Sequence, residues 1–480
     1  MDLNVIEKKI LQDPTLSRLS QLAEERKTPL FLVGGTIRDL LLQREQKSLP
    51  SHEKRDYDFT LPKEDPSFIS MMEETLRLRF FRIGKEEMNT LTYRVVKDDL
   101  SIDLTLFQGK SIQEDLKRRD FTINAIAFSL LDRSFHWVER AFEDIERRVL
   151  RTVSPFSISQ DPLRMLRAIR YFCTLEGVSL DSKLKEEISL KKDLAEKLPG
   201  ERIKMELDQI LLSPRPAAGI RSLYELGLLF ILLPELKGLE TLSQNAYHHL
   251  DVLSHVLLMT EKISWAHEWT TRTGKGPSLR PEDCLSLYYA ALFHDIGKQD
   301  TFSEDDDGKI HFYHHESFSC QRAERMMERL RFSNTLKNRV LHLVQNHMRV
   351  LNLSIESKES ALKRLVNHMA DDTPLLVLHT LADMEASRGI LSIQKDDVVE
   401  NHCLRILTLF QEKDIVHPPP LITGHDVMAL GYSQGPEVGR ILSLIRQKQV
   451  EGEIRNREEA LELLRETFGK EERHQNVLDS

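Results

Sequence analysis

The chain has 480 residues, of which 40% are hydrophobic and 30% charged, so it is long enough to bury more than one hydrophobic core. No apolar stretch reaches the roughly 20 residues of a membrane helix, and the acidic, amphipathic start is unlike a signal peptide, which excludes a membrane span and predicts a cytoplasmic protein. Four widely spaced cysteines without a CxxC pair argue against a zinc ribbon or disulfides, and the formal net charge of -9 disfavours a nucleic-acid partner unless basic residues cluster.

The amino-terminal part mixes short strand-like runs with helical stretches, which predicts an α+β fold. The strand candidates are PLFLVGG (29–35), DYDFTL (56–61), TYRVV (92–96) and LSIDLTLF (100–107). Gly34 and Gly35 separate the first run from a helix expected near Thr36. Glycines at such a turn let a phosphate approach the backbone, and free N–H groups at the helix start favour an anion. A steric need for glycine at the turn explains the pair equally well.

Three carboxylates are placed for a metal site beside that turn. Residues two apart in a strand point to the same side, so Asp56 and Asp58 present two carboxylates on one face. Asp103 alternates with apolar neighbours, which places it on the polar face of its own strand. This set predicts Mg²⁺ binding and two-metal phosphoryl transfer, with a solvated strand face as the alternative explanation.

Residues 147–172 form a basic strip in an acidic protein. Its arginines, against the single acid Asp161, are Arg147, Arg148, Arg151, Arg164, Arg167 and Arg170. The strip predicts contacts with phosphates, or a solvated helix face. Asp161 followed by Pro162 predicts a helix start with the aspartate as N-cap. Arg202 and Glu206 are spaced for a surface ion pair, or for a specific role.

The chain from about residue 140 onward shows apolar residues at spacings of three and four, which predicts an almost wholly helical remainder. The best loop candidates are residues 198–201, 269–283, 303–309 and 417–426. The acidic SEDDDGK at 303–309 predicts a hairpin tip, because no glutamate follows at the twelfth position of a calcium loop. The tail at 469–480 is expected to fray.

Five motifs occur in an order typical of one enzyme family. They are LVGGTIRDLLL (32–42), DYDFT (56–60), KRRDFTINAIAFSL (117–130), QDPLRMLRAIRYF (160–172) and ERIKMEL (201–207). In these motifs the chain resembles the class II tRNA nucleotidyltransferases, which comprise the CCA-adding enzymes and bacterial poly(A) polymerases. The resemblance implies a polymerase-β-like head, template-independent addition of C and A to a tRNA 3′ end from CTP and ATP, and Mg²⁺ as cofactor.

The resemblance also implies roles for single residues. Asp56 and Asp58 would bind the catalytic magnesium, and the strand pattern adds Asp103 as a third catalytic carboxylate. The implied nucleotide-binding residues are Gly34, Gly35, Arg38, Arg119, Asp120, Asn124, Asp161, Arg164, Arg167 and Arg170. An aspartate accepts from the exocyclic amine of cytosine or adenine, and an arginine donates to the neighbouring ring acceptor, so such side chains can replace a template.

Departures from the family pattern bear on the extent of the reaction. Gln160 stands where the family usually has an acid, and Gln108 where it often has arginine. The loop 43–55 is longer than usual, and the segment 82–94, linked in the family to adding the final A, is short and poor in glycine. A poly(A) polymerase and an enzyme adding only part of CCA therefore stay open as alternatives.

The helical half carries a second ordered set of ligand-type residues. The motifs around residues 251–260, 293–298, 312–318 and 381–389 resemble the H…HD…D pattern of HD-domain phosphohydrolases. The implied ligands of a divalent metal (Mg, Mn, Ni or another transition metal) are His255, His294, Asp295 and Asp383, with His315 and His347 as candidates for phosphate or a second ion. The resemblance implies phosphomonoester or 2′,3′-cyclic phosphodiester substrates, and the alternative is a retained but silent site.

Four parts follow from these patterns. They are a nucleotidyltransferase head (1–140), a helical neck that selects nucleotides and binds RNA (141–245), an HD domain (246–395) and a helical tail (396–480). Two other classes of protein stay open: a metal-dependent phosphohydrolase with an inactive head, and a catalytically silent RNA-binding protein.

Overall fold

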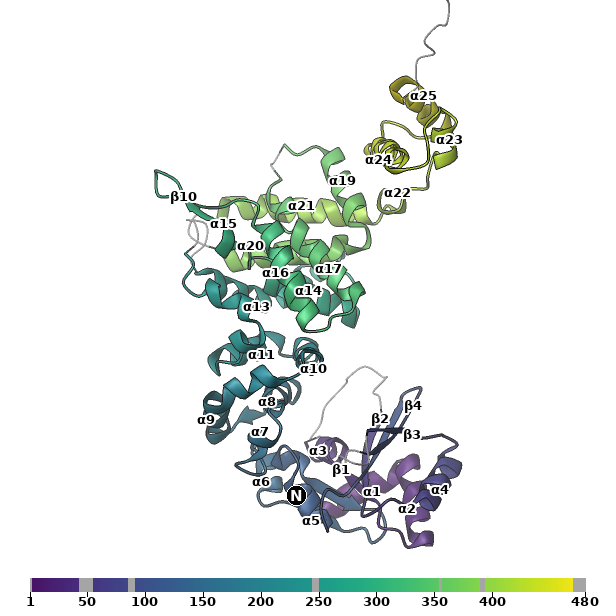
Figure 1. Ribbon diagram of the computed structural model, residues 1–480, viewed down its shortest axis with the longest axis vertical. Helices are drawn as coiled ribbons and strands as arrows, with labels where there is room; N and C mark the ends of the chain where they lie inside the picture. The colour runs from purple at the N-terminus through teal and green to yellow at the C-terminus, as the bar shows by residue number, and fades with distance from the viewer. Residues whose placement is uncertain are drawn as a thin grey trace, which may run out of the picture. The chain divides into compact units, whose positions relative to one another are not determined.

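The computed structural model describes residues 2–42, 55–84, 91–243, 250–353, 356–388 and 393–468. They form two compact units, of which unit 1 comprises Met1–Arg215 and Ser222–Leu232, and unit 2 comprises Pro216–Arg221 and Leu233–Ser480. The α+β expectation is confirmed, because unit 1 holds a seven-stranded sheet and unit 2 is mostly helical (Figure 1). Most of the long loop 43–55, the centre of the segment 82–94 and the tail 469–480 lie outside the described residues.

The sheet of unit 1 has the strand order β3-β4-β5-β2-β1-β6-β7. Its central pair, β2 with β5, is parallel, and the remaining neighbours are antiparallel. The strands are β1 (Phe31–Val33), β2 (Arg55–Leu61), β3 (Phe81–Ile83), β4 (Thr92–Lys97), β5 (Leu100–Leu106), β6 (Ile126–Ser129) and β7 (Phe135–Trp137).

Near the start of strand β2, the side chains on one side of the strand are buried and those on the other side are open to solvent. Tyr57 and Phe59 are buried, whereas Asp56 and Asp58 between and beside them keep access to solvent. The Tyr57 hydroxyl donates a 2.6 Å hydrogen bond to Asp13, which is the N-cap residue of helix α2 (Pro14–Arg26). The amino-terminal helices therefore cover the side of β2 opposite the two aspartates.

The helices of unit 1 carry the turn after β1 and the basic strip. They are α1 (Leu3–Gln12), α2, α3 (Gly35–Leu42), α4 (Pro66–Leu76), α5 (Ile112–Lys117), η2 (Thr122–Asn124), α6 (Ala141–Glu146), α7 (Ser157–Gln160), α8 (Arg164–Thr174), α9 (Ser182–Lys191), η3 (Lys192–Lys197), α10 (Gly200–Leu211) and α12 (Leu229–Leu232), with the short pair β8 (Val149–Leu150) and β9 (Ser179–Leu180). The helix α11 (Pro216–Glu225) crosses the division between the units.

Helix α8 begins at Arg164 rather than at Pro162. Asp161 is extended and its carboxylate accepts from the amide of Leu163 at 3.2 Å, so it caps a tight turn that precedes the helix. Two successive i to i+3 hydrogen bonds, from Arg164 and Met165, form this turn. Asp161 therefore caps a turn, as predicted. The helix itself begins at Arg164, two residues after the predicted start at Pro162.

Unit 2 contains one helix, α20, that is buried along nearly its whole length, and a separate hydrophobic cluster formed by α23–α25. The elements are η4 (Pro234–Leu239), α13 (Val252–Arg272), α14 (Pro281–Phe293), α15 (Lys298–Thr301), β10 (Phe302–Glu304), β11 (Ile310–Phe312), α16 (His315–Arg329), α17 (Asn334–Asn346), α18 (Met348–Leu351), α19 (Glu359–Met369), η5 (Ala370–Asp372), α20 (Thr373–Ser387), α21 (Ile393–Phe410), α22 (Lys413–Val416), α23 (Gly424–Met428), α24 (Pro436–Glu451) and α25 (Arg457–Phe468). The apolar sequence of α20 requires this burial, and the helix packs on α13.

The acidic segment 303–309 forms the end of the β10–β11 hairpin, which confirms the hairpin prediction. All four cysteines are free thiols. Within the described ranges, none of the helices combines the length and the apolar character needed to span a bilayer.

Candidate active site

The three predicted carboxylates lie together on the open face of the sheet. In the parallel β2–β5 pair, Asp58 is the register partner of Asp103, and Asp56 lies two residues earlier on the same side of β2. Arg94, on the neighbouring strand β4, donates from Nε to Asp103 at 2.6 Å. Asp103 therefore already has a cationic partner, whereas no arginine is paired in this way with Asp56 or Asp58 in the described part of the chain.

Asp58 is the most perturbed carboxyl group of this set. Burial raises the pKa of Asp58 to about 6, and the nearby charge of Asp56 adds to the effect, although Arg119 opposes it. A divalent cation would relieve both causes, because it supplies the positive charge that the buried carboxylate lacks. The residues present therefore fit Mg²⁺, the metal that a polymerase-β-like head implies.

The glycine turn after β1 brings backbone close to these groups. Gly34 has φ +75, which only glycine adopts without strain, and a Cβ there would lie 3.4 Å from Asp58 Oδ2 and 3.5 Å from Arg119 Nη1. Helix α3 follows at once from Gly35, close to the predicted start at Thr36. Its Arg38 is buried and donates to Asn124 Oδ1 at 2.8 Å.

A buried polar network joins this turn to the basic strip. Asn124 donates to Asp120 at 3.1 Å, and Arg167 of α8 pairs with the other oxygen of Asp120 at 2.8 Å. Burial would raise the pKa of Asp120, but Arg167 and the hydrogen bond from Asn124 hold it below its ordinary value. The network fixes α8 against the head within unit 1.

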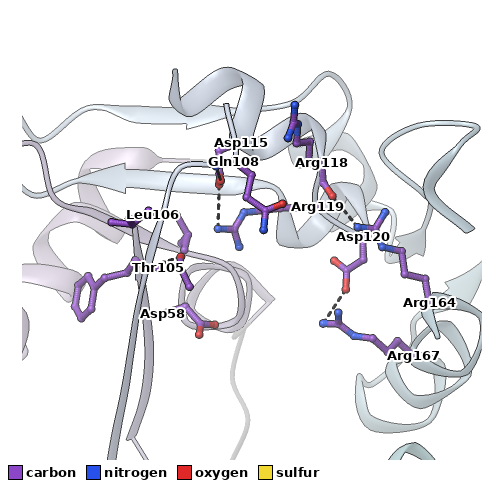
Figure 2. A pocket seen from close by; sticks show the side chains of 12 residues that line it. Asp58, Thr105, Leu106, Gln108, Asp115, Arg118, Arg119, Asp120, Arg164 and Arg167 are labelled. Atoms are coloured by element: carbon purple, nitrogen blue, oxygen red, sulfur yellow. Dashed lines mark hydrogen bonds and ion pairs between the residues drawn. The ribbon is translucent and has the colours of Figure 1, made fainter. Parts of the chain in front are cut away.

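A cavity of about 290 Å³ lies between the aspartate face and the arginines (Figure 2). Its lining residues are Val33, Asp58, Phe59, Thr105, Leu106, Gln108, Asp115, Arg118, Arg119, Asp120, Arg164 and Arg167. The buried Nε atoms of Arg119 and Arg164 have no hydrogen-bond acceptor among the residues that the structure describes. Because an unpaired buried donor costs free energy, these atoms point to an anionic or carbonyl-bearing ligand.

Some predicted residues lie elsewhere or are engaged with other partners. Arg170 points to Glu206 of α10, with 2.9 Å between Nε and Oε2, and Arg202 lies 3.5 Å from Asp161. The surface-pair alternative for Arg202 and Glu206 is not found among the described residues, where each of them has a partner on another segment. Asp161 is absent from the cavity lining, and Arg164 donates to the Arg118 carbonyl at 2.7 Å.

Three residues near the cleft were missed from the sequence. Asp115 pairs with Arg119 at 3.2 Å, and Arg118 lines the cavity beside it. Tyr171 lies in contact with the guanidinium groups of Arg38 and Arg170, at 5.0 and 4.6 Å from its ring centroid. The spacing of four residues between Asp115 and Arg119 was a usable signal.

The second predicted set also comes together, inside unit 2. We call the residues His255, His294, Asp295, His315, His347 and Asp383 the HD cluster. Their ligand atoms form two groups, His255 with His294 and Asp383, and Asp295 with His315 and His347, and within each group the atoms lie within 4.8 Å of one another. Asp295 lies near both groups, 3.2 Å from His294 Nε2 and 3.3 Å from His315 Nε2.

Two further residues complete the surroundings of the HD cluster. Lys298, which is buried, pairs with Asp295 at 2.7 Å. His379, one helical turn before Asp383, is fully buried with its ring 5.1 Å from that of His294, and burial lowers the pKa of His379 to about 3. Neutral imidazoles and carboxylates are suitable ligands for a divalent transition metal, so the donor set fits such an ion.

The sheet with its carboxylates and arginine-lined cleft is the architecture of a nucleotidyltransferase head, and comparison with known proteins gives the family. Sequence models of three family domains match the chain: the poly A polymerase head domain over residues 30–151, the "Probable RNA and SrmB- binding site of polymerase A" over 177–239, and tRNA nucleotidyltransferase domain 2 over 302–464. No HD phosphohydrolase model is among the matches.

Relatives of known function match over nearly the whole chain. A CC-adding tRNA nucleotidyltransferase of Thermus thermophilus is 34% identical over 90% of this chain and 92% of its own length. An A-adding tRNA nucleotidyltransferase of Deinococcus radiodurans is 33% identical over 89% of this chain and 93% of its own length. The chain belongs to the class II tRNA nucleotidyltransferase and poly(A) polymerase family, and it is an enzyme of the nucleotidyltransferase class.

Solved structures support the fold. The Thermotoga maritima CCA-adding enzyme complexed with tRNA has a TM-score of 0.59 at 20% identity, covering 97% of this chain and 98% of the other. A CCA-adding enzyme with CTP has a TM-score of 0.63 at 19% identity, covering 98% and 99%.

Proposed function

We propose that this enzyme transfers CMP and AMP from CTP and ATP to the 3′ end of tRNA without a nucleic-acid template. The observation that carries the proposal is the position of Asp56, Asp58 and Asp103 beside a cavity lined by arginines. Relatives that are 34% and 33% identical carry out parts of this reaction.

The residues of the cleft have separable roles in the proposed transfer. Asp56 and Asp58 would hold Mg²⁺, which supplies charge neutralisation at the phosphates and favours the alkoxide form of the attacking hydroxyl. Arg119 and Arg167 provide positive charge for the triphosphate. In the reaction, the tRNA 3′ oxygen bonds to the α-phosphorus, the bond to pyrophosphate breaks, and the hydroxyl proton is released to solvent.

Nucleotide selection is assigned to Asp161 and Arg164. The Asp161 carboxylate is 30% exposed and can accept from the amine of cytosine or adenine, whereas uracil and guanine present a carbonyl there. The unpaired Nε–H of Arg164 is a donor for the ring acceptor beside that amine. Reaching Asp161 requires its weak pair with Arg202, at 3.5 Å, to be given up.

One incorporation assay tests the proposal. Purified protein, Mg²⁺ and single labelled nucleoside triphosphates are incubated with tRNAs that lack CCA, CA or only A. Incorporation of C into the first two and A into the third supports CCA addition, and labelling by UTP or GTP would contradict the selection mechanism. Incorporation of C alone identifies a CC-adding enzyme, A alone an A-adding enzyme, and long A tracts a poly(A) polymerase.

Partial addition is a specific second candidate. The two relatives at 34% and 33% identity add CC and A respectively, and Gln160 replaces the usual acid beside Asp161. The centre of the segment linked in the family to adding the final A, residues 85–90, lies outside the described ranges. The assay above separates the partial reactions directly.

We also propose that the HD cluster binds divalent metal and hydrolyses phosphate esters. The supporting observation is that six ligand-type side chains from distant segments converge in a buried site, in two groups. Bound metal would supply an activated water and an electrophile for the phosphate. Water then bonds to phosphorus, the ester P–O bond breaks, and a proton goes to the departing oxygen.

Separate substitutions test the two sites. Asp58→Ala is expected to abolish nucleotidyl transfer and leave phosphoester hydrolysis intact, whereas Asp295→Asn should reduce metal content and hydrolysis only. Metal content is measured by elemental analysis after loading with Mn²⁺ or Ni²⁺. Equal loss of both activities in either variant would contradict separate sites.

A further inference from the structure

A row of paired residues crosses the open face of the sheet in unit 1. The row consists of Asp58, Asp103, Arg94 and Phe81, each of them the register partner of the next. Side chains of paired residues lie on the same face of a sheet, so Arg94 and Phe81 share the face of the carboxylates. Residues one position away belong to the other face, where Tyr93 is buried and the Arg82 guanidinium lies 5.6 Å from its ring centroid.

The row ends at an apolar surface beside the carboxylates. The Phe81 side chain is 51% exposed, and Val96, two residues from Arg94 on the same side of β4, is 55% exposed. Exposed apolar side chains that gather next to a candidate active site indicate a binding surface. We call Phe81, Arg94 and Val96 the β3–β4 platform.

The position of the nucleotide cavity determines the side from which the attacking hydroxyl arrives. Val33 and Asp58 line the cavity, whereas no residue of β3 or β4 does so in the part of the chain that the structure describes. In an in-line displacement, the attacking oxygen and the departing pyrophosphate lie on opposite sides of the α-phosphorus. A triphosphate in the cavity therefore leaves the β4 side of Asp103 for the nucleotide that carries the hydroxyl.

We propose that the β3–β4 platform binds the 3′-terminal nucleotide of the RNA acceptor, with its base stacked on Phe81 and its phosphate at Arg94. Phe81 lies two strands from Asp103, or about 10 Å, which is about the length of one nucleoside. Every base has a π face, so an aromatic ring can hold any terminal base. The inference rests on the proposed nucleotidyl transfer and adds the place where its second substrate binds.

Arg94 keeps donors for this phosphate while it is paired with Asp103. The pair uses Nε and Nη2, and the Arg94 side chain is 44% exposed. A guanidinium carries five N–H groups, so Nη1 and the second hydrogen of Nη2 stay available for a phosphate oxygen. Arg94 can therefore join the terminal phosphate to the carboxylate that faces the attacking hydroxyl.

A groove of about 570 Å³ continues from the platform, because Val96 lines both. The cations of its lining, Arg77, Arg79 and Lys97, outnumber its two glutamates. Within the described ranges, none of these three cations forms an ion pair, so their charge is open to phosphates. The groove therefore provides a course for the acceptor nucleotides that precede the terminal one.

Steady-state incorporation tests the platform, with the tRNA form and the nucleotide that the parent protein accepts varied separately. Phe81→Ala should raise KM for tRNA about tenfold, the size expected for loss of one base stack, and leave KM for the nucleotide unchanged. Phe81→Trp should keep both values. An unchanged KM for tRNA in Phe81→Ala overturns the platform.

Trp137→Ala is the matched control, because it removes an aromatic side chain that is 43% exposed from β7, the strand at the other edge of the same sheet. It should change neither KM value. A rise in KM for tRNA as large as that in Phe81→Ala overturns the assignment to Phe81.

Salt dependence of tRNA binding tests the groove separately. The triple variant Arg77→Gln, Arg79→Gln, Lys97→Gln should lower the slope of log K against log salt by about 2, because each phosphate contact of a single strand contributes about 0.7. Phe81→Ala should weaken binding without changing the slope. An unchanged slope in the triple variant overturns this course of the acceptor strand.

Fluorescence separates failure of the platform from failure of the transfer. If the parent protein labels no tRNA with any nucleoside triphosphate, the proposed transfer fails, and the platform is measured with tRNA whose 3′-terminal base is 2-aminopurine. Quenching of this base by the parent protein and by Trp137→Ala, but not by Phe81→Ala, supports stacking on Phe81. Equal quenching by the parent and Phe81→Ala overturns it.

Discussion

The surroundings of Asp58 lower the stability of the metal-free enzyme when this carboxyl group is ionised. Its pKa is raised from 3.8 to about 6, first by burial and then by Asp56. Between these two values the folded state holds a proton that the unfolded state has lost, so stability falls as the pH rises through this window. Above about pH 6 the full cost applies, and a difference of about two pKa units corresponds to about 3 kcal/mol.

Asp58→Asn should therefore stabilise the metal-free protein at pH 7.5 by up to about 3 kcal/mol while abolishing transfer. The gain should shrink as the pH falls from about 6 to about 4, because the wild-type carboxyl group is then protonated as well. Urea unfolding at pH 7.5 and pH 4.5 measures the difference. Asp306→Asn, at the exposed hairpin tip, is the control, and a gain independent of pH would rule out the electrostatic explanation.

Gly34 has a backbone reason to be glycine, and it lies beside Asp58. With φ +75 and a Cβ position 3.4 Å from Asp58 Oδ2, Gly34→Ala adds strain and places a methyl group where a phosphate would approach. Gly274→Ala is the matched control for Gly34→Ala, since Gly274 has φ +73 and open space around its Cβ position. Both variants should lose about 1–2 kcal/mol of stability. Only Gly34→Ala should lower kcat/KM for the nucleotide, by about tenfold or more, in steady-state incorporation assays.

At the scale of elements, a half-buried ion pair joins α8 to the head. Arg167 and Asp120 are 2.8 Å apart, with side-chain exposures of 32% and 6%. Asp120→Asn leaves the partly exposed Arg167 without its partner and should cost about 1–3 kcal/mol. Adding Arg167→Met should restore part of that loss, because the uncompensated charge is removed. Denaturant unfolding of the four proteins of the cycle gives the coupling energy.

An exposed pair provides the comparison for this cycle. Arg133 and Glu24 are 2.9 Å apart with exposures of 50% and 41%, so Glu24→Gln should cost less than about 1 kcal/mol. A cost as small for Asp120→Asn would show that α8 is held by packing alone.

Local periodicity predicted the elements that carry the carboxylates. Alternation in β2 placed Asp56 and Asp58 on one face, and the structure adds that Asp103 is the register partner of Asp58. Register between strands distant in sequence is set by tertiary packing, so it could not be read from either strand alone. The same limit explains why Glu206 was matched to Arg202, four residues away, when its partner Arg170 lies on another helix.

The HD cluster shows the corresponding limit in unit 2. The ligand-type residues were identified from an ordered motif, but their division into two groups depends on how α13, α16, α17 and α20 pack. The sequence did not indicate His379 as part of the site, because a single histidine in an apolar helix cannot be distinguished from a packing residue. Lys298 belongs to the motif FHDIGK, but only the structure shows that it pairs with Asp295.

At the scale of the whole molecule, the two compact units hold separate candidate sites. Unit 1 contains the aspartate face and the cavity, and unit 2 contains the HD cluster. A ligand that binds only the folded form of one unit raises the unfolding temperature of that unit alone. Multi-domain chains commonly unfold in more than one step, so the two contributions can be resolved.

Differential scanning calorimetry of the full chain should therefore show two transitions. With saturating Mg²⁺ present throughout, CTP should stabilise one unit and Ni²⁺ should stabilise the other, each by about 3 kcal/mol at a hundredfold excess over the dissociation constant. His255→Ala removes a ligand-type side chain that is fully buried in unit 2, so it should abolish the second shift and leave the first. Asp58→Ala should do the reverse. A single transition that moves with either ligand would mean that the two units unfold as one cooperative body and that metal binding in unit 2 stabilises the nucleotidyltransferase head as well.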